Sequence, residues 1–220
     1  MIENYTDSGT LADAAAEAIA GALTEALAQR GAASLVATGG RAPGPVYDRL
    51  ARVELDWAHV SVTLSDARCV DAGTPDSKVR LVRDRLLQGP GAAATFLPLW
   101  PPELGALEII AQLMPFDAVM LGMGEDGHIA SLIPGDPGLL DGLTTDDLTR
   151  EVPGGLGSPP IARVTLTLRT ILNARAIFLL IAGDAKREVI RRARAGEDLP
   201  VGRLLDQAQA PVRIFWQPGV

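Results

Sequence analysis

The stretch DAVMLGMGEDGHIA, residues 117–130, joins a short apolar run to a loop rich in glycine. Residues 117–121 have the length and composition of a buried strand in a parallel sheet. Residues 122–127 then form the pattern G-x-G-x-x-G, and His128 follows its last glycine. The stretch therefore presents two alternatives, a dinucleotide-binding turn or a substrate loop built around a histidine.

Apolar runs and helical patterns alternate along the whole chain. We predict strands at residues 34–38, 60–64, 117–121, 164–168, 177–181 and 212–216. We predict helices at residues 10–29, 43–50, 77–87, 103–114 and 185–195. Such alternation indicates an α/β protein with a mostly parallel sheet flanked by helices, in a Rossmann-like arrangement.

Length and composition indicate the class of protein. The 220 residues fit a single domain, 1–220, in which the Gly- and Pro-rich residues 134–160 form a surface excursion, a candidate flap. A net charge of -7 argues against nucleic-acid binding, and no apolar run is long enough to span a membrane or resembles a signal peptide. With a single cysteine, the chain is expected to be cytoplasmic.

Four groups of polar and glycine residues follow predicted strands. They are residues 38–41, 65–68, 122–128 and 183–186. Ligands of open parallel sheets collect at the carboxyl ends of the strands, so these groups are expected to meet in one site.

The dinucleotide alternative needs a long helix after the glycines and an acidic residue at the end of the next strand. Pro134 ends any helix here after barely two turns, and no such strand follows. The glycines then serve a backbone that approaches a small substrate, with Asp126 and His128 facing it. Histidine suits proton transfer near neutral pH, whereas His59 has no comparable neighbours and is expected to be structural.

Several segments along the chain together form a recognisable set of motifs: ATGGRAP (37–43), DWAHV (56–60), SDARCV (65–70), PDSK (75–78), GMGEDGHIASLIPG (122–135), PP with RVTLT (159–160 and 163–167) and AGDAK (182–186). In this order they resemble the motifs of the 6-phosphogluconolactonases, which open 6-phosphoglucono-1,5-lactone in the pentose phosphate pathway. The resemblance spans nearly the whole chain and implies the fold of glucosamine-6-phosphate deaminase.

The resemblance also implies roles for individual residues. His128 becomes the general base that activates water, and Asp66 orients either that base or a substrate hydroxyl. Arg68 binds phosphate or polarises the substrate, and Arg163 and Lys186 bind phosphate. Lys186 also lies in the first turn of a predicted helix, which favours an anion.

Further substrate contacts are implied for the two glycine loops, through Gly39, Gly40, Arg41, Gly124, Asp126 and Gly127. The implied partner is a phosphorylated sugar lactone, with no cofactor and no metal, and the chain is expected to be a monomer or a homodimer.

The chain departs from the family pattern at four positions. Arg41 and Ala42 replace Ser and Thr, Ala67 replaces Glu, and Lys78 replaces Asn. Two alternatives therefore remain. One is a glucosamine-6-phosphate deaminase/isomerase, which shares residues 126–130 but has Glu where this chain has Ile133. The other is a sugar-phosphate-binding module that has lost catalysis.

Overall fold

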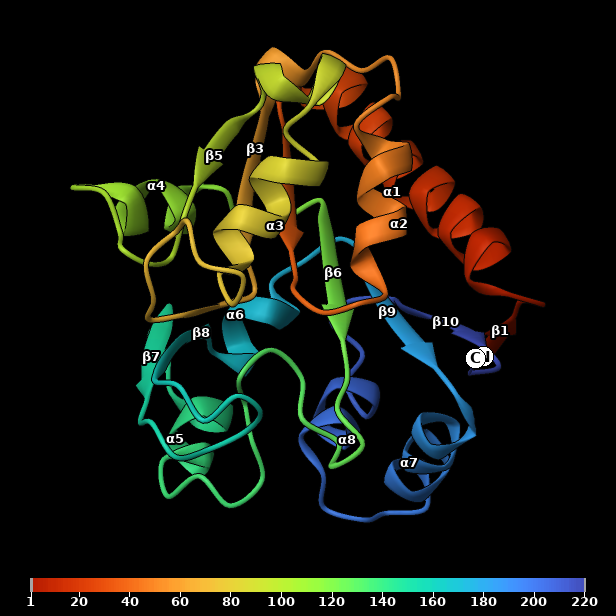
Figure 1. Cartoon of the computed structure of the whole chain (residues 1–220), viewed down its shortest axis with the longest axis vertical. Coiled ribbons are helices and arrows are strands. Elements are labelled where there is room, and N and C mark those ends of the chain that lie inside the picture. Colours follow the sequence, from red (N-terminus) through yellow and green to blue (C-terminus); the bar gives the residue numbers. More distant parts are fainter. Residues whose placement is uncertain (1, 220) are drawn as a thin grey trace.

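The computed structural model describes residues 2–219 and is built around a seven-stranded sheet (Figure 1). Every strand pair in this sheet is parallel, in the order β1-β10-β9-β6-β2-β3-β5. The strands are β1 (Ile2–Asn4), β2 (Ala33–Ala37), β3 (Val60–Leu64), β5 (Thr95–Leu97), β6 (Ala118–Gly122), β9 (Ile177–Ala182) and β10 (Val212–Gln217). The predicted α/β class with a parallel sheet is confirmed.

Helices flank this sheet. They are α1 (Ser8–Arg30), α2 (Pro43–Leu50), α3 (Lys78–Arg85), α4 (Ala106–Gln112), α5 (Leu139–Thr144), α6 (Leu168–Leu172), α7 (Asp184–Arg194) and α8 (Pro200–Leu205), with short 3-10 turns η1 (Trp57–His59) and η2 (Gly89–Ala93). Asp7 caps α1 by accepting a hydrogen bond from the Thr10 amide. The buried face of α1 packs against β2, β6, β9 and β10, which explains its regular apolar spacing.

A smaller antiparallel sheet lies beyond the carboxyl ends of the main strands (Figure 1). It contains β4 (Asp66–Arg68), β8 (Arg163–Leu166) and β7 (Thr149–Val152). The strand predicted at 164–168 belongs to this sheet and ends earlier than expected. Thr167 caps α6 at this point, so the chain turns into a helix directly after Leu166.

Other differences concern short or glycine-interrupted elements. The helix predicted at 103–114 is α4, which begins later because Gly105 has a left-handed φ of 79°. Strands β1 and β5 were not predicted because three residues carry too little periodicity. The excursion at 134–160 contains α5 and β7.

The strand order reverses between β2 and β6. From β2 the chain continues to β3 and β5 on one side, then returns to place β6 on the other side. Such a reversal leaves a crevice outside the carboxyl ends of the two strands. Because both strands are buried almost throughout, their ends hold the loops that follow them in fixed positions.

The opposite ends of β2 and β6 are joined by the buried carboxylate of Asp117. One oxygen accepts hydrogen bonds from the amide and hydroxyl of Ser34, at 2.8 and 3.2 Å. The other lies 2.5 Å from a guanidinium nitrogen of Arg30 and 3.2 Å from one of Arg175. This carboxylate therefore fixes how the two strands that form the crevice start beside each other.

Replacing Asp117 by alanine is expected to lower the free energy of unfolding by about 3 kcal/mol, because a buried amide and two arginines lose their partner. Urea unfolding measures this loss. The control is Asp146→Ala, which removes a carboxylate that is 78% exposed and pairs with Arg169. It should cost less than about 1 kcal/mol. Equal losses in the two variants would contradict the role assigned to Asp117.

Candidate active site

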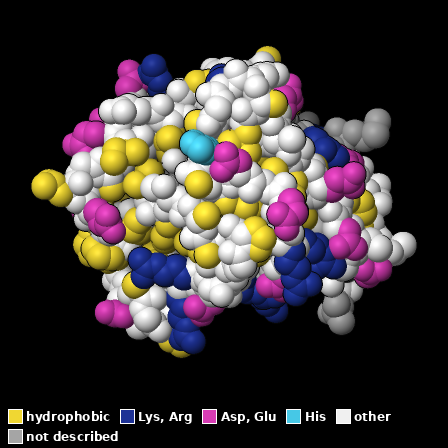
Figure 2. Space-filling view, turned by 90° about the horizontal axis from the view of Figure 1, so that it is seen from above, with side chains coloured by type: hydrophobic (Ala, Val, Ile, Leu, Met, Phe, Trp, Pro, Cys, Tyr) yellow, Lys and Arg dark blue, Asp and Glu magenta, His cyan; other side chains and the backbone are white. Residues whose placement is uncertain are grey.

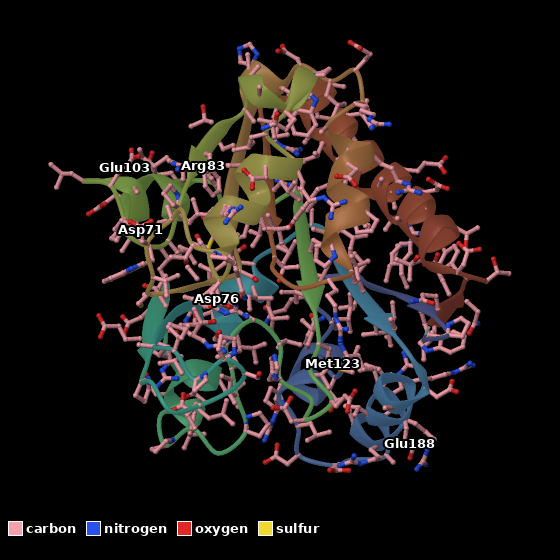
Figure 3. The ribbon with its side chains drawn as sticks, viewed as in Figure 1. Asp71, Asp76, Arg83, Glu103, Met123 and Glu188 are labelled. Carbon is pink, nitrogen blue, oxygen red and sulfur yellow. The ribbon has the colours of Figure 1, made fainter. Side chains whose placement is uncertain are left out.

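A cavity of about 280 Å³ opens at the crevice between the ends of β2 and β6. Its walls come from the loops after β2 and β6, from β4, and from the starts of α3 and α7. Figure 3 places Met123, one of the lining residues, just below the end of β6. The lining residues are Thr38, Gly39, Gly40, Arg41, Ala42, Pro43, Arg68, Lys78, Gly122, Met123, Gly124, His128, Ala130, Ser158, Arg163, Leu180 and Lys186.

The charged side chains that line this cavity are all basic. Arg41, Arg68, Lys78, Arg163 and Lys186 line it, and no carboxylate does so among residues 2–219. The end of the molecule where the main strands begin faces the reader in Figure 2, and there basic, acidic and apolar side chains are mixed. Gathering five cations in a protein of net charge -7 favours a small, strongly anionic ligand at this place.

His128 lies on the loop after β6 with its ring oriented by Asp126. Its Nδ1 is 2.6 Å from Asp126 Oδ1, so Nε2 is the ring nitrogen left for the cavity. Burial alone would raise the pKa of Asp126, but the hydrogen bond and charge of His128 outweigh it and hold the pKa below its usual range. An ionised Asp126 favours the tautomer in which Nε2 accepts a proton.

The glycines of this loop make room for that pair. A side chain on Gly124 would collide with the His128 ring and with Asp126. Gly127 has a φ of 80° and faces Leu199, outside the cavity lining. Among the described residues, no helix lies between Gly122 and Gly138, so the dinucleotide alternative is wrong for this loop.

Asp66 lies beneath the cavity floor and is fully buried. Both carboxylate oxygens are 2.5 Å from Lys78 Nζ, and the hydroxyls of Ser65 and Ser131 donate to them at 3.0 and 2.5 Å. Burial acts to raise the pKa of Asp66, but the Lys78 charge and these hydrogen bonds keep it below its ordinary value. Asp66 is therefore an ionised anchor covered by Lys78, and does not line the cavity with His128.

Arg68 and Arg163 enter the cavity from the neighbouring strands β4 and β8. Arg68 donates to the backbone oxygen of Asp76 at 2.9 Å, and Asp76 is labelled in the loop before α3 in Figure 3. Arg163 donates to the backbone oxygen of Pro159 at 2.8 Å. The Nε atoms of both arginines are buried without a partner among the described residues. Buried unpaired donors of this kind are suited to an anionic ligand.

Lys186 and Arg41 also line the cavity, and their two charges repel each other. Lys186 is the third residue of α7, and burial lowers the pKa of its ammonium group, with the charge of Glu125 opposing this effect. The loop after β2 adds Gly39 and Gly40, the latter with a φ of 109°. These positions agree with the sequence-based expectation that the two glycine loops and α7 meet.

Sequence reasoning assigned no site role to Lys78, Ser131 or Ser158. Lys78 was noted only as a departure from a family motif, yet it lies on the cavity floor. The capping position of Ser77 before α3 gives a signal, because it places Lys78 at the start of a helix that follows the Asp66 segment. Ser131 lies three residues after His128 but contacts Asp66, far away in the sequence.

Within residues 2–219, no group of three or more His, Cys, Asp or Glu side chains is arranged as a metal-binding cluster. No helix of this part of the chain combines the length and the apolar composition required to cross a membrane.

Comparison with known proteins gives consistent matches over nearly the whole chain. The family model described as glucosamine-6-phosphate isomerases/6-phosphogluconolactonase matches residues 6–216. The 6-phosphogluconolactonase of Caulobacter vibrioides is 40% identical, over 98% of this chain and 96% of that protein.

Solved structures of related proteins have the same fold as this chain. The crystal structure of a 6-phosphogluconolactonase from Shewanella baltica superimposes with a TM-score of 0.91 at 36% identity, covering 99% of this chain and 97% of that one. A monomeric glucosamine-6-phosphate deaminase has the same fold, with a TM-score of 0.77 at 22% identity over 97% of this chain and 96% of that one. The chain therefore belongs to the 6-phosphogluconolactonase family, within the larger group of glucosamine-6-phosphate isomerases and 6-phosphogluconolactonases.

Proposed function

We propose that the chain hydrolyses 6-phosphoglucono-1,5-lactone to 6-phosphogluconate, in the oxidative branch of the pentose phosphate pathway. The observation that carries the proposal is a cavity in which an Asp126-oriented His128 faces five cations. A phosphorylated lactone has the two features that such a cavity fits, a dianionic phosphate and an ester carbonyl. Membership of the family supports the same substrate.

His128 acts as the general base in this scheme. Its Nε2 takes a proton from water while the water oxygen forms a bond to the lactone carbonyl carbon. The carbonyl π electrons move to the oxygen, which gives a tetrahedral oxyanion. When that intermediate collapses, the bond from carbon to ring oxygen breaks and His128 returns the proton to the leaving oxygen. Asp126 stabilises the imidazolium present between the two proton transfers.

The phosphate is held at a distance from the reacting carbon. Arg163, with its unpartnered Nε, and Lys186, in the first turn of α7, are assigned to it. Arg41 adds charge on the Lys186 side, and Arg68 on the Arg163 side binds phosphate or polarises the substrate. Binding the phosphate fixes the lactone ring over His128, so that hydrolysis becomes a reaction within one complex.

The deaminase/isomerase alternative is less well supported. Moving a proton between sugar carbons calls for a carboxylate that faces the substrate. Lys78 covers Asp66, and Ile133 stands where those enzymes have glutamate. A module that only binds sugar phosphate would keep the cations but would not require the Asp126–His128 pair or the space that Gly124 leaves for it.

Replacing His128 by alanine is expected to lower kcat/KM by about 10²- to 10⁴-fold, because the general base is lost. The measurement is lactone consumption above the spontaneous rate. His59→Ala is the matched control, since the side chain of His59 is 61% exposed and contacts only Asp56 among the described ion pairs. It should leave turnover unchanged. Equal activity of the two variants, or no acceleration by the unmodified chain, would overturn the proposal.

The phosphate assignment is tested with two lactones. Lys186→Met should raise KM for the phosphorylated lactone roughly 10- to 100-fold, the value of one charge-assisted hydrogen bond. The same variant should leave the slower hydrolysis of unphosphorylated glucono-1,5-lactone unchanged. Arg191→Met changes an exposed residue of the same helix, paired with Glu188, and serves as control. A similar loss with both lactones would show that Lys186 does not bind the phosphate.

A further inference from the structure

Among residues 2–219, Lys78 is the one cavity cation whose charge is matched by a fully buried carboxylate in direct contact. Its side chain is 11% exposed and lies across Gly39, where an added Cβ would be only 2.6 Å from Cδ and Cε. This close approach lets the ammonium group reach the floor, 2.5 Å from both oxygens of Asp66. The absence of a side chain at Gly39 therefore leaves space for the Lys78 side chain as well as for the ligand.

The pair of Lys78 and Asp66 differs in net charge from Arg163 and Lys186. Arg163 and Lys186 have no direct carboxylate partner among the described ion pairs and suit a phosphate that is charged throughout the reaction. The Lys78–Asp66 pair is neutral overall, so it attracts a dianion only weakly. A neutral, oriented donor instead favours a group that becomes negative during the reaction.

The same pair is connected to the loop of the general base. Asp66 accepts a hydrogen bond from Ser131, which lies three residues after His128 and is itself fully buried. The amide of Ser131 donates to Thr165 Oγ1 at 3.1 Å, and this fixes the loop to β8. Lys78 and His128 therefore line one cavity at positions that the same buried contacts determine.

We propose that Lys78 is a catalytic residue that stabilises the oxyanion of the tetrahedral intermediate, an inference that rests on the proposed lactonase function. Two of its three N–H bonds are directed at Asp66, and the third donates to the lactone carbonyl oxygen as that oxygen gains negative charge. Lys78 transfers no proton; the electron pair returns from the oxyanion as the bond to the ring oxygen breaks. Asp66 acts through Lys78 as a positioning residue.

The test compares kcat and KM in variants in which positions 66 and 78, at the cavity floor, carry no net charge. Lys78→Met alone would leave Asp66 charged and unpaired, so it is combined with Asp66→Asn. We expect the double variant to lose about 10²-fold in kcat, with KM for the phosphorylated lactone changed less than about threefold. The control is Arg80→Met, an exposed position on the same helix whose side chain is 47% exposed and pairs with Asp84. Its kcat should equal that of the unmodified chain.

Thermal unfolding shows whether the double variant folds. If it does not, Lys78→Gln combined with Asp66→Asn keeps the floor neutral and retains an N–H donor, and it is expected to lose about tenfold in kcat without a rise in KM. A folded variant with unchanged kcat, or one in which only KM rises, overturns the inference and leaves the lactonase proposal standing. If the unmodified chain does not accelerate hydrolysis, both are overturned.

Discussion

The buried carboxylate of Asp66 is the constraint on which the candidate site depends. It is held by Lys78 from α3, by Ser131 from the loop of His128 and by the adjacent Ser65, so one charge joins α3 and the loop of His128 to the end of β3. A buried charge is tolerated only when its hydrogen bonds are complete. Replacing any one of these partners alone would therefore destabilise the site. The cavity floor is therefore defined by one interaction.

The strand order explains why this floor lies where a ligand can reach it. The reversal between β2 and β6 opens a crevice, and the flanking strands β3 and β9 deliver Asp66 and Lys186 to its two sides. Cations without a direct carboxylate partner suit a permanent phosphate charge, whereas the neutral Lys78–Asp66 pair suits a charge that appears only in the transition state. This division of charge is what makes hydrolysis of a phosphorylated lactone the function that the cavity supports best.

Much of this arrangement was predictable from the sequence. Apolar runs followed by glycine predicted β2, β6 and β9. The groups that follow these strands were expected to meet in one site, and Gly39, His128 and Lys186 do line one cavity. Strand β8 was predicted as a strand, but its place in a second, antiparallel sheet was not, because alternating residues fit either sheet equally well. The pairing of Lys78 with Asp66 could not be predicted, because tertiary packing brings the two together and no local pattern shows which carboxylates are covered.

The most direct measurement is a crystal structure of the chain with bound 6-phosphogluconate, the product of the proposed reaction. Its carboxylate derives from the lactone carbonyl and reports where the reacting carbon lies. The account predicts phosphate oxygens within hydrogen-bond distance of Arg163 and Lys186, and the carboxylate between His128 Nε2 and Lys78 Nζ. A product bound in the reverse direction, with phosphate beside His128, or bound outside this cavity, would contradict it.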